Sequence, residues 1–192
     1  VSCLGLEAVA PQRKGCAVTR SFSRKVTDLG DMLEAVATHA TRGAEKLRTN
    51  GLETGHITVF MQTSPFGDGP SHSVSKTLQF PETTADTLDL VRAAKQGAAG
   101  IFKPGYRYAK AGIIMEDLVE AGSAPRALFE QRDREKSASL MEALDAINQK
   151  YGRGTVAPAA IGKKRDWQTK FEMRSPEYTT CLADIPTVNA RS

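Results

Sequence analysis

The stretch HITVFMQTSPF, residues 56–66, determines how the rest of this chain can fold. Ile57, Val59 and Met61 alternate with residues of the opposite face, which is the two-residue period of a β-strand with one buried side. Pro65 ends the run, because a proline has no N–H to donate to a neighbouring strand. The other face carries hydroxyl and amide groups instead of catalytic acids. Such a face suits contacts with phosphates or with a backbone better than bond-making chemistry.

Length and composition are those of an ordinary soluble protein. The 192 residues suffice for one sizeable core, or for one domain with an appendage. Hydrophobic residues make up 40% and charged residues 25%. Lys and Arg number 26 against 22 Asp and Glu, and the pI is about 9.0. This excess is too small for a polycation, so any contact with nucleic acid must depend on where individual cations lie.

Cysteine usage and hydropathy favour a cytoplasmic protein. Cys3, Cys16 and Cys181 are odd in number and widely spaced, which does not fit a disulfide framework or a CxxC zinc site. No apolar run approaches the ~18 residues of a membrane span, and no secretory signal opens the chain. The chain begins at Val1 instead of Met, and we interpret residues 1–11 as the end of a linker from a longer protein.

Further strands are predicted over residues 14–22, 73–80 and 106–118. A helix is predicted between the strand of residues 14–22 and the strand that follows Gly55. Thr27 or Asp28 is the expected cap of this helix, and Asn50 and Gly51 end it. Its apolar face comprises Leu29, Met32, Leu33, Val36, Ala40 and Leu47. A second helix begins at a capping box of Thr83 and Asp86 and turns Leu88, Val91, Ala94 and Ala98 inward.

The order strand, helix, strand, strand, helix, strand predicts an α+β, ferredoxin-like split β-α-β fold with a four-stranded sheet. Two helices cover one face of this sheet and leave the other open. We expect polar side chains on the open face and at the strand ends to contact nucleic acid: Arg20, Ser21, Arg24, Thr58, Gln62, Thr63, Ser73, Ser75, Lys76, Arg107, Tyr108 and Lys110. Only Phe60, Tyr106 and Tyr108 could stack on bases, too few for an RRM-type platform. The alternative for the charged end of the first strand is a solvated edge kept soluble by its charges.

Four motifs resemble a known family. RSFSRKVTDLGDMLEAVATHATRGAEKLR (residues 20–48), HITVFMQTSPF, GYRYAKAG (105–112) and MRSPEYTT (173–180) are similar to the C-terminal part of UmuC-type Y-family translesion DNA polymerases. The resemblance covers nearly the whole chain and keeps the order of the motifs. It implies that residues 12–118 form the little finger, the accessory domain whose sheet lies in the major groove beside the primer-template duplex and contacts its phosphates.

The resemblance also implies a role and partners. The role is translesion synthesis in SOS-type DNA repair and mutagenesis, in the nucleoid region of the cytoplasm. The partners are primer-template DNA, the sliding clamp, RecA and a UmuD′ dimer. Polymerase chemistry needs palm-domain carboxylates that hold Mg²⁺, and no stretch here resembles the palm motifs. We therefore expect no catalytic residue in this chain and no DNA synthesis by it alone; the adjacent pair Glu116 and Asp117 is interpreted as the exit of a strand.

Residues 119–136 read as a linker, and residues 137–192 resemble the small C-terminal extension of the UmuC type. In the linker, Leu128 and Phe129 match the apolar anchors of a clamp-binding peptide, but the Gln that this motif normally contains is missing. The alternative is an apolar anchor on the domain's own surface. In the extension we expect a helix over 137–150, with Leu140, Ala143, Leu144 and Ile147 on one side, and a strand over 155–161.

Trp167, which lies within a basic run, is interpreted as a core anchor. The run comprises Lys163, Lys164, Arg165, Lys170 and Arg174, and could lie on nucleic acid or form a solvated face.

Other chemistry-bearing residues lack the arrangement that a site needs. His39, His56 and His72 do not have metal-ligand spacing, so no zinc is expected. Ser21 and Ser64 have no nearby His and acid to activate them. Two hypotheses therefore remain. The chain is either the DNA-binding portion of an error-prone polymerase, or a free-standing ferredoxin-like module that binds RNA or a protein.

Overall fold

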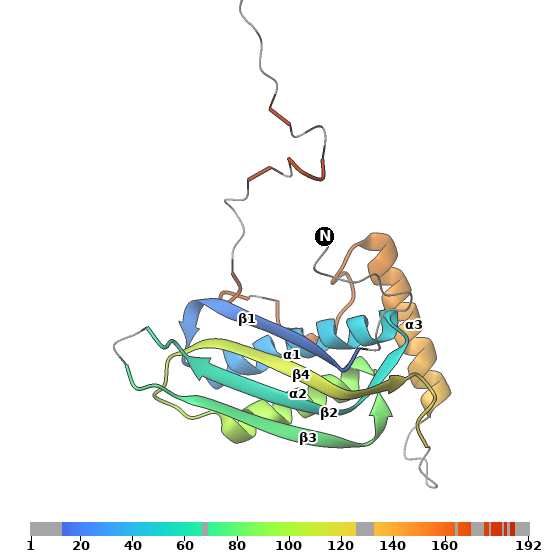
Figure 1. Cartoon of the computed structure of the whole chain (residues 1–192), viewed down its shortest axis with the longest axis horizontal. Coiled ribbons are helices and arrows are strands. Elements are labelled where there is room, and N and C mark those ends of the chain that lie inside the picture. Colours follow the sequence, from blue (N-terminus) through green and yellow to red (C-terminus); the bar gives the residue numbers. More distant parts are fainter. Residues whose placement is uncertain are drawn as a thin grey trace, which may run out of the picture.

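A sheet and two long helices form the body of the molecule, and a third helix follows them (Figure 1). The computed structural model describes residues 13–66, 69–125, 133–163, 165–169, 175–176, 178–181, 183 and 185–186. Its elements are β1 (Gly15–Val26), α1 (Leu29–Thr49), β2 (Leu52–Thr63), β3 (Ser73–Thr84), α2 (Thr87–Ile101), β4 (Tyr108–Glu120), α3 (Arg134–Tyr151) and the short 3-10 helix η1 (Ala159–Ile161). None of the helices in these ranges is long and apolar enough to cross a membrane.

The four strands are arranged in the order β1-β4-β2-β3, and every neighbouring pair is antiparallel. β4 therefore lies between β1 and β2, and β2 lies between β3 and β4. Both β-α-β crossovers are split in this way, which confirms the predicted α+β plan with a four-stranded sheet and two helices. The central strands are β4 and β2, a variant of the ferredoxin-like order.

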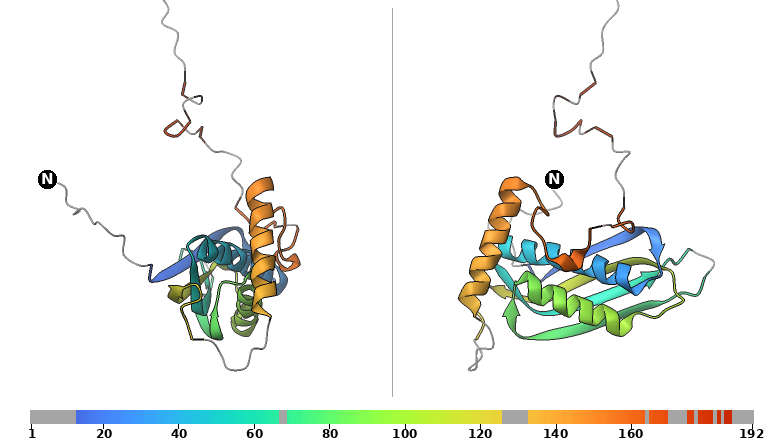
Figure 2. Two further views of the ribbon diagram at one scale, coloured as in Figure 1. Left: turned by 90° about the vertical axis from the view of Figure 1, so that its right-hand side faces the viewer. Right: turned by 180° about the vertical axis from the view of Figure 1, so that it is seen from behind.

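The core lies between the sheet and the helix layer. In Figure 1 the sheet is in front of α1 and α2, and Figure 2 shows both helices on the same side of it. Ile57, Val59 and Met61 of β2 are completely buried, together with Ile113 and Met115 of β4. Each such side chain contributes about 1.5–3 kcal/mol of hydrophobic stabilisation. The alternation predicted for residues 56–62 is confirmed.

Helix α1 begins and ends where the sequence indicates. Asp28 is the N-cap, and its carboxylate accepts a hydrogen bond from the Asp31 N–H at 3.2 Å. Asn50 is the C-cap, and Gly51 follows with a φ of 64°, the left-handed conformation that favours glycine. On the predicted apolar face, Met32, Val36, Ala40 and Leu47 are buried, Leu33 is half-buried and Leu29 is exposed.

Helix α2 differs from the prediction in its first turn. Asp86 alone is the N-cap and accepts from the Leu88 and Asp89 N–H groups, whereas the Thr83 hydroxyl donates to Glu53. Leu88 is exposed and Leu90 is buried in its place. Val91, Ala94 and Ala98 are buried as predicted, so the inward face is right from the second turn onward.

Three strands are longer than predicted: β1 runs on to Val26, β3 to Thr84, and β2 begins at Leu52 instead of after Gly55. β4 has the predicted length but is shifted by two residues, since it begins at Tyr108 instead of Tyr106 and ends at Glu120.

Gly55 lies within β2, whose pairing with β4 passes from Thr54↔Leu118 to His56↔Glu116 without a shift. The register shift at this point is in the pairing with β3, where Thr54 pairs with Thr84 and His56 with Gln79, so the extra residues belong to β3. The Thr54 hydroxyl is close to two carbonyls there, at 2.8 Å from His56 O and 2.6 Å from Glu116 O. Continuous pairing with β4 therefore carries β2 through a glycine that was predicted to precede the strand.

The C-terminal extension packs on the helix side of the domain (Figure 2). In α3, Met141 is buried, whereas Leu140 is 52% exposed, so the predicted apolar side is not the side that faces the domain. Residues 155–161 form a turn and η1 instead of the predicted strand. Trp167 is 2% exposed and its ring packs on Phe22, which confirms it as a core anchor. The Ser23 N–H donates to Trp167 O at 3.0 Å, so the extension also covers part of the outer edge of β1.

Candidate nucleic-acid interface

The face of the sheet opposite the helices is built from four rows of side chains. The strand registers give these rows from one end of the sheet to the other: Ser21, Lys110, Gln62 and Ser73; then Thr19, Gly112, Phe60 and Ser75; then Ala17, Ile114, Thr58 and Thr77; then Gly15, Glu116, His56 and Gln79. Paired residues of an antiparallel sheet project to the same side, so each row is one line across the open face. We call this surface the open face. Eight of its 16 positions carry a hydroxyl or amide side chain.

Side chains pack closely over a glycine at the middle of the open face. A Cβ at Gly112 would lie 2.7 Å from Thr19 Cγ2 and 2.9 Å from Phe60 Cε1, so the Phe60 ring and the Thr19 side chain close over the glycine. In the next row the hydroxyls of Thr58 and Thr77 are 2.8 Å apart and hydrogen-bonded. The absence of a side chain at Gly112 lets a broad, low surface form at the centre of the sheet.

Charge is distributed unevenly along the open face. Lys110 lies in the row at one end, and exposed Arg107 immediately precedes β4 there. At the other end Glu116 is 54% exposed, and its carboxylate is 3.8 Å from His56 Nε2. An anionic ligand is therefore attracted to the Lys110 end and repelled from the Glu116 end.

Three of the predicted interface residues lie on the other side of the sheet. Arg20 pairs with buried Ala111, so it projects toward the helices. Lys76 pairs with buried Val59 and extends toward Gly100 of α2, where a Cβ would be 3.0 Å from the Lys76 ammonium. Tyr108 is completely buried, and its hydroxyl hydrogen-bonds to the backbone of Lys103. Their predicted display on the open face is wrong.

Two more of those residues are engaged in local contacts. The Thr63 hydroxyl accepts a hydrogen bond from the His72 N–H at 2.9 Å, and the Thr63 N–H donates to His72 O, which joins the ends of β2 and β3. Arg24 forms an ion pair with Asp31 at 2.7 Å, at the first turn of α1. Neither side chain belongs to the four rows.

The remaining residues predicted to contact nucleic acid lie on or beside the open face. Ser21, Thr58, Gln62, Ser73, Ser75 and Lys110 lie on the open face, and Arg107 is exposed beside it. Leu128 and Phe129 lie outside the described residues. Thr19, Thr77 and Gln79 belong to the face but are missing from the predicted set. The alternation that marked Ser73 and Ser75 also marks Thr77 and Gln79, so the same signal could have found them.

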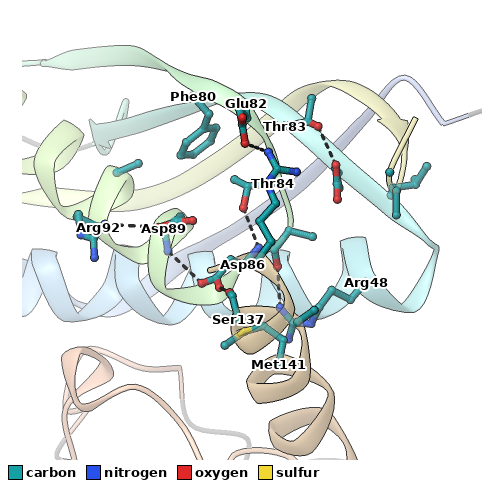
Figure 3. A pocket seen from close by; sticks show the side chains of 18 of the residues that line it. Arg48, Phe80, Glu82, Thr83, Thr84, Asp86, Asp89, Arg92, Ser137 and Met141 are labelled. Atoms are coloured by element: carbon teal, nitrogen blue, oxygen red, sulfur yellow. Dashed lines mark hydrogen bonds and ion pairs between the residues drawn. The ribbon is translucent and has the colours of Figure 1, made fainter. Parts of the chain in front are cut away.

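A cavity of about 1220 Å³ lies between β3, α2 and α3. Figure 3 shows that side chains from these elements and from α1 converge there. Arg48 donates two hydrogen bonds to the Asp145 carboxylate, at 2.7 and 2.6 Å. Ser137 donates to Asp86, and the Thr87 N–H lies 3.4 Å from the Met141 sulfur. Polar contacts between elements therefore line this cavity, and we interpret it as the seam where α3 docks.

The seam does not suit an anionic ligand. Its lining includes six carboxylates against three guanidinium groups: Glu53, Glu82, Asp86, Asp89, Glu142 and Asp145 against Arg48, Arg92 and Arg134. None of the described residues that line it is a His, Cys or Lys. Within the described ranges, no group of three or more His, Cys, Asp or Glu side chains could hold a metal ion. Among these surfaces the open face is the best candidate for binding nucleic acid.

Comparison with protein families gives two matches. The impB/mucB/samB family C-terminal domain matches residues 13–128, which include every strand of the sheet together with α1 and α2. A domain of unknown function, DUF4113, matches residues 138–188, which begin within α3.

Several bacterial proteins are similar in sequence to this chain. Protein UmuC of Salmonella typhimurium (strain LT2) is 39% identical over 185 residues, which cover 95% of this chain and 44% of that protein. Protein SamB of Salmonella typhimurium is 41% identical, and protein MucB of Escherichia coli is 33% identical; each match covers 96% of this chain and 44% of the relative. The chain thus spans less than half the length of these relatives.

Among solved structures, a complex of the beta-clamp processivity factor and the little finger domain of PolIV matches with a TM-score of 0.39 and 12% identity. The match covers 62% of this chain and 99% of that chain.

Proposed function

The chain belongs to the impB/mucB/samB family, as the C-terminal part of a UmuC-type Y-family DNA polymerase, and on this premise we propose that its open face holds primer-template DNA. The ligand is the sugar-phosphate backbone of a duplex. The proposal rests on the four rows of the open face, where hydroxyl and amide groups cover a broad surface and Lys110 lies at one end. Such groups are the usual partners of phosphate oxygens.

The chemistry of the face favours contacts that do not depend on base sequence. Hydroxyls and amides on neighbouring strands can follow a line of phosphates without reading base edges, and a lysine adds a point charge. The Glu116 end would repel the same backbone, so the duplex approaches the half of the face that includes Lys110 and Ser21. Nonspecific binding of this kind has a Kd of about 10⁻⁴ to 10⁻⁶ M at physiological salt.

The role of the whole protein follows as part of the same proposal. The chain would be the accessory portion of an error-prone translesion polymerase that acts in SOS-type repair and mutagenesis, in the nucleoid region of the cytoplasm. Its partners would be the sliding clamp, through Leu128 and Phe129, together with a UmuD′ dimer and RecA. The Mg²⁺ ions of nucleotide transfer would be held by palm carboxylates in another part of such a protein. No catalytic step is assigned to residues of this chain.

The second candidate is an RNA- or protein-binding module that acts outside a polymerase. The aromatic residues of the open face bear on whether such a module would bind RNA. Phe60 is the one aromatic ring among the four rows, apart from the imidazole of His56, and it lies against Gly112 and Thr19. Recognition of single-stranded RNA on a sheet relies on two or three stacked bases. The open face therefore favours duplex DNA over single-stranded RNA.

Fluorescence anisotropy of the chain with a labelled primer-template duplex and with single-stranded RNA, at two salt concentrations, tests the proposal. We expect salt-sensitive binding to the duplex with little dependence on its sequence, and weaker binding to RNA, because phosphate contacts release counterions. No duplex binding, or a clear preference for RNA, would refute the proposed function and favour the second candidate.

A further inference from the structure

Several arginines lie near a buried tryptophan on the side of the domain away from the open face. One of them is Arg42 of α1, which is half-buried and lies three residues from both His39 and Glu45. Residues spaced by three lie on one face of a helix, so these side chains form one line. His39 packs edge-on against Trp167, with ring centroids 6.3 Å apart, and Glu45 accepts a bond from Arg153 at 3.1 Å.

The other arginines come from β1 and from the extension. Arg20 projects from β1 to the helix side, as does Phe22, whose ring is 5.9 Å from that of Trp167. Arg165 lies two residues before Trp167 in the extension, and the Asp166 carbonyl accepts a bond from the Ser23 hydroxyl. Four guanidinium groups, from Arg20, Arg42, Arg153 and Arg165, are thus brought to one corner by three separate segments of the chain.

Several nitrogen atoms of this corner are buried without a partner among the described residues. They are Trp167 Nε1, Arg165 Nε and His39 Nε2. Trp167 and His39 are each only 2% exposed. An indole N–H and a guanidinium N–H can only donate hydrogen bonds, so the Trp167 and Arg165 donors lack acceptors. Buried donors without a partner cost free energy, and a ligand with several acceptor oxygens would satisfy them.

Electrostatics agrees with this geometry. Burial lowers the pKa of Arg42, and the neighbouring Arg20, Arg153 and Arg165 lower it further, while Glu45 acts in the opposite direction. Burial, followed by the charges of Arg42 and Arg20, lowers the pKa of His39 to about 4. His39 is therefore neutral near pH 7, and the corner has an excess of positive charge that an anion would relieve.

We propose that this corner is a binding site for a phosphoryl group, held by the guanidinium groups of Arg42 and Arg165 with the indole N–H of Trp167. Arginine presents a planar fork of donors that matches two oxygens of a phosphate at once. The tetrahedral arrangement of phosphate oxygens also leaves an acceptor for the Trp167 N–H. The phosphoryl group belongs either to free phosphate or to a DNA backbone outside the duplex held by the open face. The site stands independently of the function proposed for that face.

Trp167 makes the site directly observable, because it is the only tryptophan of the chain. The experiment titrates the purified chain with sodium phosphate near pH 7, at ionic strength kept constant with sodium chloride, and records tryptophan fluorescence. We expect a saturable change in the emission. Arg42→Gln should raise the midpoint by about tenfold or more, since a charge-assisted hydrogen bond is worth about that factor in affinity.

Two controls make the result specific. Arg92→Gln removes an arginine of α2 that is 77% exposed and pairs with Asp89, and it should leave the midpoint unchanged. Lys110→Gln alters the open face and should not affect the titration, so failure of the DNA proposal and failure of this one are distinguishable. Arg165→Gln provides a second test of the site if Arg42→Gln lowers the melting temperature. An emission that does not respond saturably, or the same midpoint in both site variants as in the parent, would overturn the inference.

A final arm identifies the source of the phosphoryl group. Short DNA is added in place of phosphate, with the Lys110→Gln chain so that binding at the open face is weakened. If DNA produces the saturable change and phosphate competes with it, the DNA backbone supplies the group. If only phosphate produces the change, the ligand is a free phosphate. Either result supports the site, provided that Arg42→Gln weakens it.

Discussion

The ion pair between Arg48 and Asp145 should determine how firmly α3 is held on the domain. Arg48 lies at the end of α1, and its guanidinium donates to both carboxylate oxygens of Asp145, at 2.7 and 2.6 Å. The same group donates to Ala85 O and to the Thr87 hydroxyl. The perturbation we choose is Asp145→Asn, which keeps the size of the side chain but removes its charge and one of the two acceptor oxygens.

The expected loss follows from the exposure of the pair. The Arg48 side chain is 16% exposed and that of Asp145 is 34% exposed, so the pair lies between a surface and a buried ion pair. Surface pairs contribute about 0–1 kcal/mol, and breaking a buried pair costs about 3–5 kcal/mol. Because Arg48 retains its bonds to Ala85 and Thr87, we expect a loss of about 1.5 kcal/mol in the free energy of undocking α3. That loss corresponds to an approximately tenfold change in the equilibrium.

Hydrogen exchange of the α3 amides measures this equilibrium directly, since local opening controls their exchange. Asp145→Asn should speed exchange throughout α3 by about tenfold while leaving the amides of β2 and β4 unchanged. The matched control is Arg92→Gln, which breaks an exposed pair of 3.4 Å on α2 and should change stability by less than about 0.5 kcal/mol. Unchanged α3 exchange in Asp145→Asn, or equal effects of the two variants, would refute the argument that this pair holds the helix.

Two further predictions concern stability. The pKa of His39 is about 4 in the folded chain, below its usual 6.5, so the unfolded state binds more protons between these values. The free energy of unfolding should therefore decrease as the pH falls through this window, by about 2 kcal/mol between about pH 7 and about pH 5. Urea denaturation would measure this, and a His39→Gln variant that keeps the same pH dependence would contradict it. Gly112→Ala should cost about 1–3 kcal/mol because its Cβ would press on Thr19 and Phe60. The control is Gly69→Ala, whose added Cβ has no atom within 4 Å and should change thermal stability by less than about 0.5 kcal/mol. Equal melting temperatures for the two variants would contradict the close packing around Gly112.

Sequence periodicity was sufficient for the elements whose two faces differ strongly. Ile57, Val59 and Met61 alternate with polar or half-buried neighbours, and all three are completely buried. The cap could be narrowed to Thr27 or Asp28, of which the structure has Asp28, and the end of α1 at Asn50 could also be predicted, because capping depends on local chemistry that the sequence contains. The element order then follows, and with it the split plan of the sheet.

The side to which a residue projects could not be predicted where a bulge intervenes. Register shifts occur between Ser21 and Val26 and between Gln62 and Thr63, and both lie beside Tyr108. Each shift changes the face that the following residues occupy, which is why Tyr108 is buried although Lys110 is on the open face. A shift of this kind leaves no periodic signal in the sequence.

Arg20 and Lys76 are misplaced for a different reason. Each lies on the helix side near the margin of the sheet, where a long cationic side chain can cross apolar surface and reach solvent. Polar character alone therefore did not indicate the face. Alternation would have been a better criterion, because Arg20 is adjacent to Ser21 and Lys76 is adjacent to Ser75.

The contacts of the extension lie beyond any local pattern. Arg48 and Asp145 are 97 residues apart, and Ser23 and Asp166 are 143 residues apart. Polar bonds with this separation orient α3, so its buried side is determined by Arg48 and Met141 more than by its apolar stripe. The arginine corner around Trp167 has the same origin, since three segments contribute to it.

The most direct test of the DNA-binding face compares two lysines that sequence analysis treated alike. Lys110 lies on the open face, whereas Lys76 projects to the helix side. The measurement is the salt dependence of duplex binding, by fluorescence anisotropy between about 50 and about 200 mM salt, for the parent, Lys110→Gln and Lys76→Gln. Losing one phosphate contact reduces the slope of log K against log salt by about 0.9, which is about a threefold difference over this range. We predict the reduced slope for Lys110→Gln and the parental slope for Lys76→Gln; equal slopes for all three chains, or a reduced slope only for Lys76→Gln, would contradict the assignment of the open face as the DNA-binding surface.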